Sequence, residues 1–551
     1  MTGDSVTKQL IGRALQFASE EMGLALRDSA YSPNIKERMD HSAAVFDSSG
    51  RLVAQAEHIP VHLGSLPWGL ARLLEYCGKE RLELEVGSML VSNDPYLTGT
   101  HLNDLTVLAP VHHRGRLVAY LANKAHHSDV GGVAPGSISM GARTLFEEGT
   151  VLEPTYLWRR HGFVTSVVDS FARASRTPRE RRGDIKAQVA ANITGSRRLS
   201  GLIERYGADV FSSALRYRVS HSEALTKKRL DRLTPGVYRS EDYLEGANGE
   251  EVVLRVRADV SPSGVKLDYA GTSTQVEYPL NAVLGVTVSG AFYVLRCLLG
   301  SDIPATHGAF SCLSIRVPLC SVLNPTRPHP VGAGNVETSQ RNADLLFRAL
   351  TTSAPSIIPA AAGGSMNNVM MGGRTAQGQW AFYETLGVGL GGGPSWDGVD
   401  GIQSNMTNTM NTPVEEMERS FPVMVTEYGL RPDSSGAGKW RGGSGIVRSY
   451  KILQGPVVFT IVAERSKHRP WGLLGGLEGA HTEVVLVREG VRKPIPVKST
   501  LRLQKGDELT VRTAGGGGYG SPSERPSDRT QRDIASGLLT RKSAKEYRRA
   551  G

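Results

Sequence analysis

The chain has 551 residues, of which 40% are hydrophobic and 21% charged, so it can bury a substantial core. Its four cysteines form no CxxC pair, which argues against a disulfide framework and favours reduced thiols. It contains no run of ~20 apolar residues and no secretory leader pattern, so we expect a cytoplasmic protein that does not span a membrane.

The formal net charge of +10 raises the question of nucleic-acid binding. Much of the excess lies in residues 173–182 and in the tail that ends RKSAKEYRRAG. Neither run interleaves aromatic residues at a spacing suited to stacking on bases, and neither belongs to a recognisable nucleic-acid-binding motif. We therefore expect no nucleic-acid partner and interpret both runs as solvated segments or subunit contacts.

The chain begins with a predicted helix that leads into antiparallel strands. Residues 5–30 carry two adjacent apolar rows at helical spacing, and the pattern ends at Ser32-Pro33, where proline disfavours continuation. The rows consist of Leu10, Ala14 and Phe17, and of Ile11, Leu15, Ala18 and Met22. The runs SAAVFD and RLVAQA then flank Ser48-Ser49-Gly50, a polar turn that predicts a hairpin.

The rest of the chain alternates helical and β-type segments. Helical periodicity returns at 200–232, 280–300 and 335–353, and β-type alternation is found at 240–270 and 420–515. A glycine-rich stretch precedes the last of these. The order of segments predicts a mixed α+β fold in which several lobes share one body, with antiparallel β-rich regions and buried helices.

Four parts are expected along the chain. They are an N-terminal α/β region at 1–235, a central α+β region at 236–420, a β-rich lobe at 421–522 and a basic tail at 523–551. No internal repeat and no long low-complexity linker separates them, which indicates that the lobes pack together.

Residues that could bind a metal or take part in catalysis are concentrated between Asn93 and Pro154. Two β-type runs, LTVLAPV and RLVAYLAN, are joined by HHRG, which suits a hairpin turn. If the hairpin is symmetric about Gly115, Asp104 lies opposite His126. Such facing residues have Cα atoms ~4.5–5.5 Å apart and project their side chains from one face.

His101 precedes Asp104 by three residues, in the turn that enters the first strand, so its imidazole can fold over the same spot. Two imidazoles and one carboxylate form a donor set that leaves positions open for water and substrate. The alternative is that these are ordinary hydrogen-bonding groups in a polar loop. Because the strand register brings Asp104 and His126 together and His101 reaches the same place, we expect the three residues to bind a divalent transition metal: Zn²⁺, Mn²⁺ or Fe²⁺.

Further polar groups surround these three residues, namely Asp94, Asn103, His127, Asp129, Glu147 and Glu148. We interpret His127, Asp129 and Glu148 as groups that orient the ligands or transfer protons. The glycines of DVGGVAPGS suit a loop that approaches a ligand closely, although a plain surface turn explains them almost as well.

The stretch NDPYLTGTHLNDLTVLAPV, with AHHSDVGGVAPGS and EEGTVLEP after it, resembles the signature region of the hydantoinase B/oxoprolinase family, which includes the α subunits of acetone and acetophenone carboxylases. The resemblance continues in SPNIKERMDHSAAVFDSSGRLVAQAEHIPVHLGS, GDIKAQVAAN, DYAGTSTQ, NPTRPHPVGAGNVETSQRNAD, DGVDGIQSNMTNTMNTPVEEMERSFPV, DSSGAGKWRGGSG and AGGGGYGSP. It covers the chain in order up to about Pro522, which makes it more specific than one short motif.

The resemblance implies a metal at the three positions named above. It also implies that Asp40, His58 and His62 lie near the active centre, and the two histidines, with Asn103, are candidate substrate-binding residues. Asp40 is a candidate base for activating water; the alternative is a structural carboxylate paired with Arg38.

Members of the hydantoinase and oxoprolinase type use ATP, yet this chain has no recognisable phosphate loop. No GxxxxGK[ST] occurs, and the nearest approach, SSGAGKW, places Trp440 after Lys439. GVGLGG satisfies GxGxxG, but Pro394 follows and no helix pattern begins there. The resemblance therefore implies a hetero-oligomer in which an A-type subunit with an actin-like ATPase fold binds ATP.

These features predict the B-type subunit of an ATP-dependent cyclic amidohydrolase that acts on a hydantoin, an oxoproline or a lactam. The alternative is the α subunit of an acetone or acetophenone carboxylase, which acts on a ketone. The intact metal ligands argue against a third possibility, a non-catalytic scaffold. The absence of GxSxG argues against a serine nucleophile.

Overall fold

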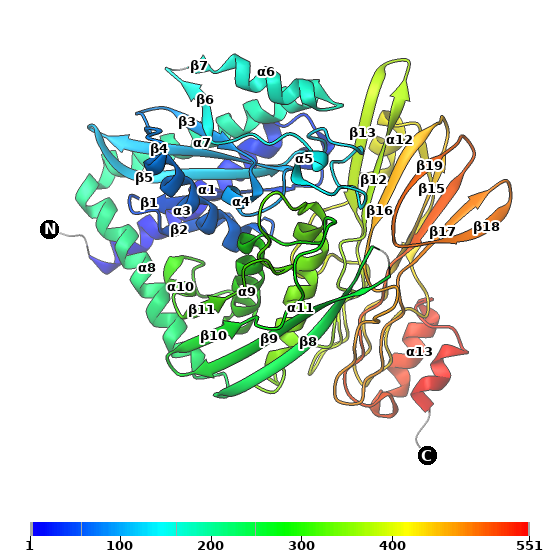
Figure 1. The fold of residues 1–551 in the computed structure, drawn as a ribbon. Helices are drawn as coiled ribbons and strands as arrows, with labels where there is room; N and C mark the ends of the chain where they lie inside the picture. The colour runs from blue at the N-terminus through cyan, green and yellow to red at the C-terminus, as the bar shows by residue number, and fades with distance from the viewer. Residues whose placement is uncertain (1–3, 57, 161, 248, 549–551) are drawn as a thin grey trace.

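The computed structural model describes residues 4–56, 58–160, 162–247 and 249–548. The described ranges contain helices and strands, and the mostly antiparallel strands form four open sheets. This combination confirms the mixed α+β fold (Figure 1). In these ranges no helix combines the length and the apolar character needed to cross a membrane.

A seven-stranded sheet forms the core of the N-terminal region, with strand order β2-β1-β5-β4-β3-β6-β7. Its strands are β1 (His41–Asp47), β2 (Leu52–Ala56), β3 (Met89–Ser92), β4 (Asp104–His113), β5 (Arg116–His126), β6 (Thr155–Arg159) and β7 (Gly162–Phe163). The antiparallel pair β1–β2 is the hairpin predicted around Ser48-Ser49-Gly50.

Helices cover both faces of this sheet. Ala43 and Val45 of β1 belong to a buried cluster shared with α1 (Ser5–Ser29) and α7 (Pro178–Tyr206). Ala44 and Phe46 belong to a second cluster, shared with α3 (His62–Lys79). All of β1 is therefore buried between the two layers of helices. The sheet is a covered central layer, and this packing holds the ends of β4 and β5 in place.

The central region adds a four-stranded sheet and two buried helices. The strands are β8 (Gly236–Glu245), β9 (Glu251–Ser261), β10 (Gly264–Asp268) and β11 (Leu313–Arg316). The helices predicted at 280–300 and 335–353 are present as α9 (Leu284–Leu299) and α11 (Ser339–Leu350), and a π-helical turn, Gly334–Thr338, leads into α11. Because α9 packs on both α3 and α11, it joins the central region to the N-terminal one.

Two sheets form the C-terminal lobe around one shared core. One contains β12 (Asn368–Thr375), β13 (Gly378–Thr385), β16 (Val457–Val462) and β19 (Lys498–Leu503). The other contains β14 (Val423–Leu430), β15 (Ile446–Ile452), β17 (Glu483–Arg488), β18 (Val491–Ile495) and β20 (Glu508–Arg512). The first sheet combines strands from both sides of the boundary predicted at residue 420, so the two parts are continuous there.

The remaining α-helices complete the described chain. They are α2 (Pro33–Lys36), α4 (Pro95–Thr98), α5 (Leu145–Glu148), α6 (Thr165–Ala174), α8 (Ala208–Leu230, the longest of this group), α10 (His307–Phe310), α12 (Val414–Ser420) and α13 (Ser527–Ala535). The tail is anchored beside α13, where Asp533 pairs with Arg441 at 3.1 Å and with Arg525 at 2.7 Å.

The basic run at 173–182 differs from the expectation of a solvated segment. It lies largely in α6 and α7, and several of its arginines pair within the chain. Arg176 contacts Asp129 at 2.9 Å, and the fully buried Arg181 contacts Asp184 at 3.1 Å. The interpretation of this run as solvated is wrong for Arg176 and Arg181, which join loops and helices, whereas Arg173 and Arg179 are exposed.

Glycine-rich segments of the C-terminal lobe lie backbone against backbone. The amide of Gly443 donates to Leu390 O at 2.7 Å, and the amide of Gly516 donates to Gly443 O at 2.9 Å. A Cβ atom on Gly442 would overlap the carbonyl oxygen of Gly516. Side chains are excluded at such positions because the segments approach more closely than a methyl group allows.

We therefore expect Gly442→Ala to destabilise the protein by ~3 kcal/mol, an overpacking effect against an immobile backbone. Gly429→Ala is the matched control, because Gly429 is exposed in β14 and a Cβ there meets no atom within 4 Å. Thermal unfolding followed by calorimetry compares the two. Equal unfolding temperatures for both variants would show that the array tolerates side chains.

Candidate metal centre

The mouth of the β4–β5 hairpin brings the predicted ligands together. Asp104, the first residue of β4, pairs with His126, the last residue of β5, which confirms the predicted register. The turn is shorter than predicted: residues 112 and 113 extend β4, and only Arg114-Gly115, both at positive φ, connects the strands. A register shift after Val111 compensates for the shorter turn.

Three ligand-type atoms, from His101, Asp104 and His126, form a small triangle at this mouth. His101 Nε2 lies 3.1 Å from His126 Nδ1 and 3.4 Å from Asp104 Oδ1, and His126 Nδ1 lies 3.3 Å from the same oxygen. Two ligand atoms bound to one ion at ~2.0–2.2 Å are themselves ~3–3.5 Å apart. The three separations fall in this range, so the donor set fits a single divalent ion. All three side chains are buried.

The second ring nitrogen of His101 is also held in place. His101 Nδ1 lies 3.2 Å from Gly332 O, and with Nε2 as the ligand atom this nitrogen carries the proton and donates it. Glu148 accepts hydrogen bonds from the amides of Val331 and Gly332 at 2.9 and 2.7 Å. Burial raises the pKa of Glu148 to about 7. Glu148 thus positions the loop that orients His101.

Charge and burial favour the metal-binding forms of Asp104 and His126, whereas, despite burial, the nearby Asp104 carboxylate raises the pKa of His101. Burial alone would raise the pKa of Asp104, but His101, His126 and His62 hold it well below its usual range, so the carboxylate is ionised. Burial lowers the pKa of His126, which keeps the imidazole neutral with a lone pair available. An ionised carboxylate and a neutral imidazole are the forms that bind divalent metals.

Asp40 lies beside the triangle, immediately before β1. Its Oδ2 is 3.9 Å from His126 Nδ1 and 3.4 Å from Asn34 Nδ2, and its backbone carbonyl accepts the His126 amide at 3.0 Å. Arg38 does not pair with Asp40 among the described residues; its guanidinium reaches Tyr383 O and neighbouring polar groups instead. The alternative of an Arg38–Asp40 pair is therefore wrong, and the Asp40 carboxylate faces the candidate centre.

The two histidines of HIPVH occupy different places. His62, at the start of α3, puts Nε2 3.5 Å from Asp104 Oδ2, and Ser42 Oγ lies 3.0 Å from its other nitrogen. His58 packs instead against His41 and against Gly23 of α1. His62 thus contacts a candidate ligand, whereas His58 is outside the cavity described below.

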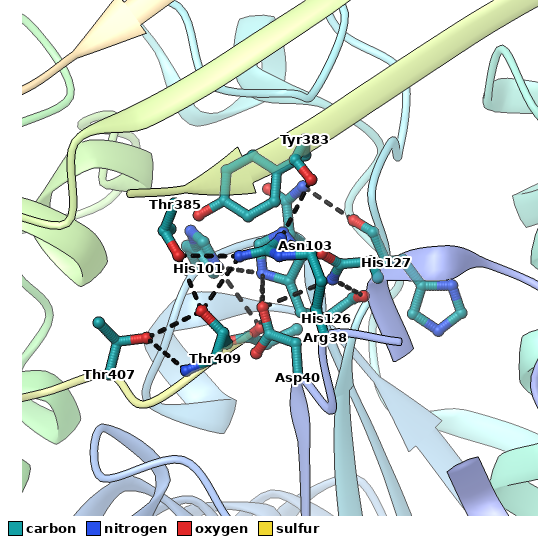
Figure 2. A network of polar contacts seen from close by, with 12 residues as sticks. Arg38, Asp40, His101, Asn103, His126, His127, Tyr383, Thr385, Thr407 and Thr409 are labelled. Atoms are coloured by element: carbon teal, nitrogen blue, oxygen red, sulfur yellow. Dashed lines mark hydrogen bonds and ion pairs between the residues drawn. The ribbon is translucent and has the colours of Figure 1, made fainter. Parts of the chain in front are cut away.

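The remaining predicted site residues lie behind the triangle. Asn103 donates to the carbonyls of His127 and Gly136 at 2.9 and 3.1 Å, so its amide shapes the loop after β5. The His127 ring points away from the cluster toward Gln188, 3.1 Å away (Figure 2). Asp129 accepts bonds from the Gly131 and Gly136 amides and from Arg176. These contacts are structural, and none reaches the triangle.

A small cavity of about 20 Å³ adjoins the centre. This volume holds about one water molecule. Its walls include residues that the sequence reasoning missed, from segments more than 200 residues beyond the hairpin: Asn335, Val336, Met366, Tyr383, Thr385, Met406 and Thr407. Tyr383 stacks on the His126 ring with centroids 4.7 Å apart. The motifs around Asn335 and Met406 were the only signal for this second wall.

Comparisons with known proteins agree with this architecture. The family model for hydantoinase B/oxoprolinase matches residues 4–522. The 5-oxoprolinase 1 of Arabidopsis thaliana is 34% identical over 545 residues, which cover 94% of this chain but only 42% of the plant protein. The chain thus spans less than half the length of that relative.

Two solved structures share the fold. The ATP-dependent caprolactamase from Pseudomonas jessenii is 25% identical, with a TM-score of 0.92 over 99% of this chain and 96% of that chain. Acetone carboxylase superposes with a TM-score of 0.89 over 99% of this chain and 79% of that chain, and at 16% identity this likeness concerns the fold alone. By the extent of the family match and the identity to the plant enzyme, the chain belongs to the hydantoinase B/oxoprolinase family.

Proposed function

We propose that this chain is the B-type subunit of an ATP-dependent enzyme that opens a cyclic amide. In this proposal His101, Asp104 and His126 hold a divalent transition metal, Zn²⁺, Mn²⁺ or Fe²⁺, and an A-type partner binds ATP. The observation that carries the proposal is the buried triangle of ligand atoms with a carboxylate, Asp40, at its edge. The substrates named in 5-oxoprolinase and caprolactamase are both lactams, which supports a ring amide as substrate.

The chemistry explains why ATP and this site belong together. A ring amide resists water because its resonance is lost in the transition state, and phosphorylation of the amide oxygen by the partner creates a leaving group. An ion bound here would lower the pKa of a nearby water and polarise the carbonyl. Asp40 accepts the proton of the attacking water, for which the small cavity beside the centre has room.

Two observations support a separate ATP-binding partner. More than half of the plant 5-oxoprolinase has no counterpart in this chain, whose sequence contains no phosphate loop. The solved caprolactamase chain, in contrast, is matched over 96% of its length, so a chain of this size occurs in an ATP-dependent enzyme. We propose that the missing portion is supplied by an A-type subunit in a hetero-oligomer.

The isolated chain is expected neither to bind ATP nor to open 5-oxoproline, ε-caprolactam or hydantoin, because its sequence contains no phosphate loop. ATP-dependent ring opening of one of these probes should appear when an A-type subunit is added. Calorimetric titration with ATP, followed by product analysis of the mixture, tests both statements. Tight ATP binding by this chain alone, or no turnover of any probe by the mixture, would contradict the proposal.

A further inference from the structure

An apolar stripe lies on the outer face of α1. Leu10, Phe17 and Leu24 are spaced seven residues apart and are 56%, 62% and 46% exposed, and Val6, one turn before Leu10, is 61% exposed. A seven-residue spacing keeps side chains on one side of a helix, so the stripe from Leu10 to Leu24 is ~21 Å long. Single exposed apolar residues are common, but an aligned row marks a surface that associates.

Charges are arranged oppositely on the two sides of Phe17. Arg13 lies between Leu10 and Phe17, and among the described residues it forms no ion pair. Glu21 lies between Phe17 and Leu24 and pairs with Arg198 at 2.6 Å. The stripe therefore has a cation on the N-terminal side of Phe17 and, on its C-terminal side, a carboxylate that Arg198 already contacts.

We propose that α1 pairs with α1 of a second copy of this chain, antiparallel and with the two-fold axis at Phe17. In that arrangement residue i faces residue 34 − i. Leu10 then meets Leu24 of the other copy, the two Phe17 rings meet at the axis, and Arg13 meets Glu21 twice. A parallel pair would set Arg13 against Arg13, whereas the antiparallel pair matches opposite charges and closes as a symmetric dimer.

The surface beside the stripe has room and charge for this partner. A groove of about 660 Å³ lies between α1 and α8, and its walls include Arg13, Phe17 and Arg218. Neither arginine forms an ion pair within the part of the chain that the structure describes, but Arg218 donates to Val53 O at 2.8 Å. Glu20 and Asp302 also line the groove. Burial, and to a smaller extent the nearby Arg13, lower the pKa of Arg218.

Site-directed disulfides test the direction of pairing. In the full chain with the exposed Cys297 and Cys320 replaced by serine, Leu10→Cys and Leu24→Cys are prepared separately. Oxidation of the mixture should give a covalent dimer, because position 10 of one copy faces position 24 of the other. Oxidation of either variant alone should give none, because its two cysteines then lie at opposite ends of the stripe. Equal cross-linking by Leu10→Cys alone, or none in the mixture, overturns the antiparallel pair.

Sedimentation tests the pairing itself. Sedimentation of the unmodified chain should give twice the monomer mass. Phe17→Glu should raise the dimer dissociation constant at least about 30-fold, as expected for an aromatic residue at the centre of an interface. Val86→Glu is the control, because Val86 is 72% exposed outside α1 and should leave the constant unchanged. A monomeric chain, or a Phe17→Glu variant that dimerises like the unmodified chain, overturns the proposal. Neither experiment depends on the metal centre or on ATP.

Discussion

Asp40→Asn is expected to lower kcat of the complex with the A-type subunit by ~10²–10⁴, the usual cost of removing a general base. Asparagine keeps the shape of the side chain but cannot accept the proton of water. Because Asp40 Oδ2 lies 3.9 Å from His126 Nδ1, the proton acceptor sits beside the ligand triangle without being part of it. Folding, metal content and association with the partner should therefore stay unchanged.

The matched control is Asp47→Asn, at the other end of β1, where the carboxylate pairs with Arg51 at 2.8 Å. This change should leave kcat unchanged, because Asp47 lies outside the cavity. A loss of metal in Asp40→Asn would instead assign Asp40 as a fourth ligand. If kcat stays within about twofold of the unmodified complex across about pH 6–9, Asp40 is a structural carboxylate.

The hairpin half of the site was predictable because its information is local. Strand alternation and a short turn placed Asp104 opposite His126, and His101 follows from its position three residues earlier. The same alternation implies that His127 faces the other way from His126, as its contact with Gln188 shows. A side chain that faces away from the triangle is poorly placed to transfer a proton there.

The other half of the site depends on contacts that sequence spacing does not encode. Tyr383 and Asn335 reach the cavity only because the C-terminal lobe and the π-helical turn pack against the hairpin. Glu148 received a role in proton transfer from its sequence, yet its carboxylate binds the amides of a loop almost 200 residues away. Composition and periodicity predict the kinds of elements, and tertiary packing decides which side chains share a cavity.

The second large effect concerns the metal itself. Removing one of three ligands leaves two donors and a hole in a buried site, so binding should be lost rather than weakened slightly. His101→Ala and His126→Ala should each reduce bound metal from about one ion per chain to below ~0.1. His113→Ala is the matched control, because His113 belongs to the same hairpin but lies at its far end, and this variant should keep its metal.

Elemental analysis of the purified chain and these three variants, each checked for folding by circular dichroism, is the most direct test of the metal centre. The geometry predicts about one transition-metal ion per chain in the unmodified protein and in His113→Ala, and almost none in His101→Ala and His126→Ala. Folded His101→Ala and His126→Ala variants with the metal content of the unmodified chain would contradict it.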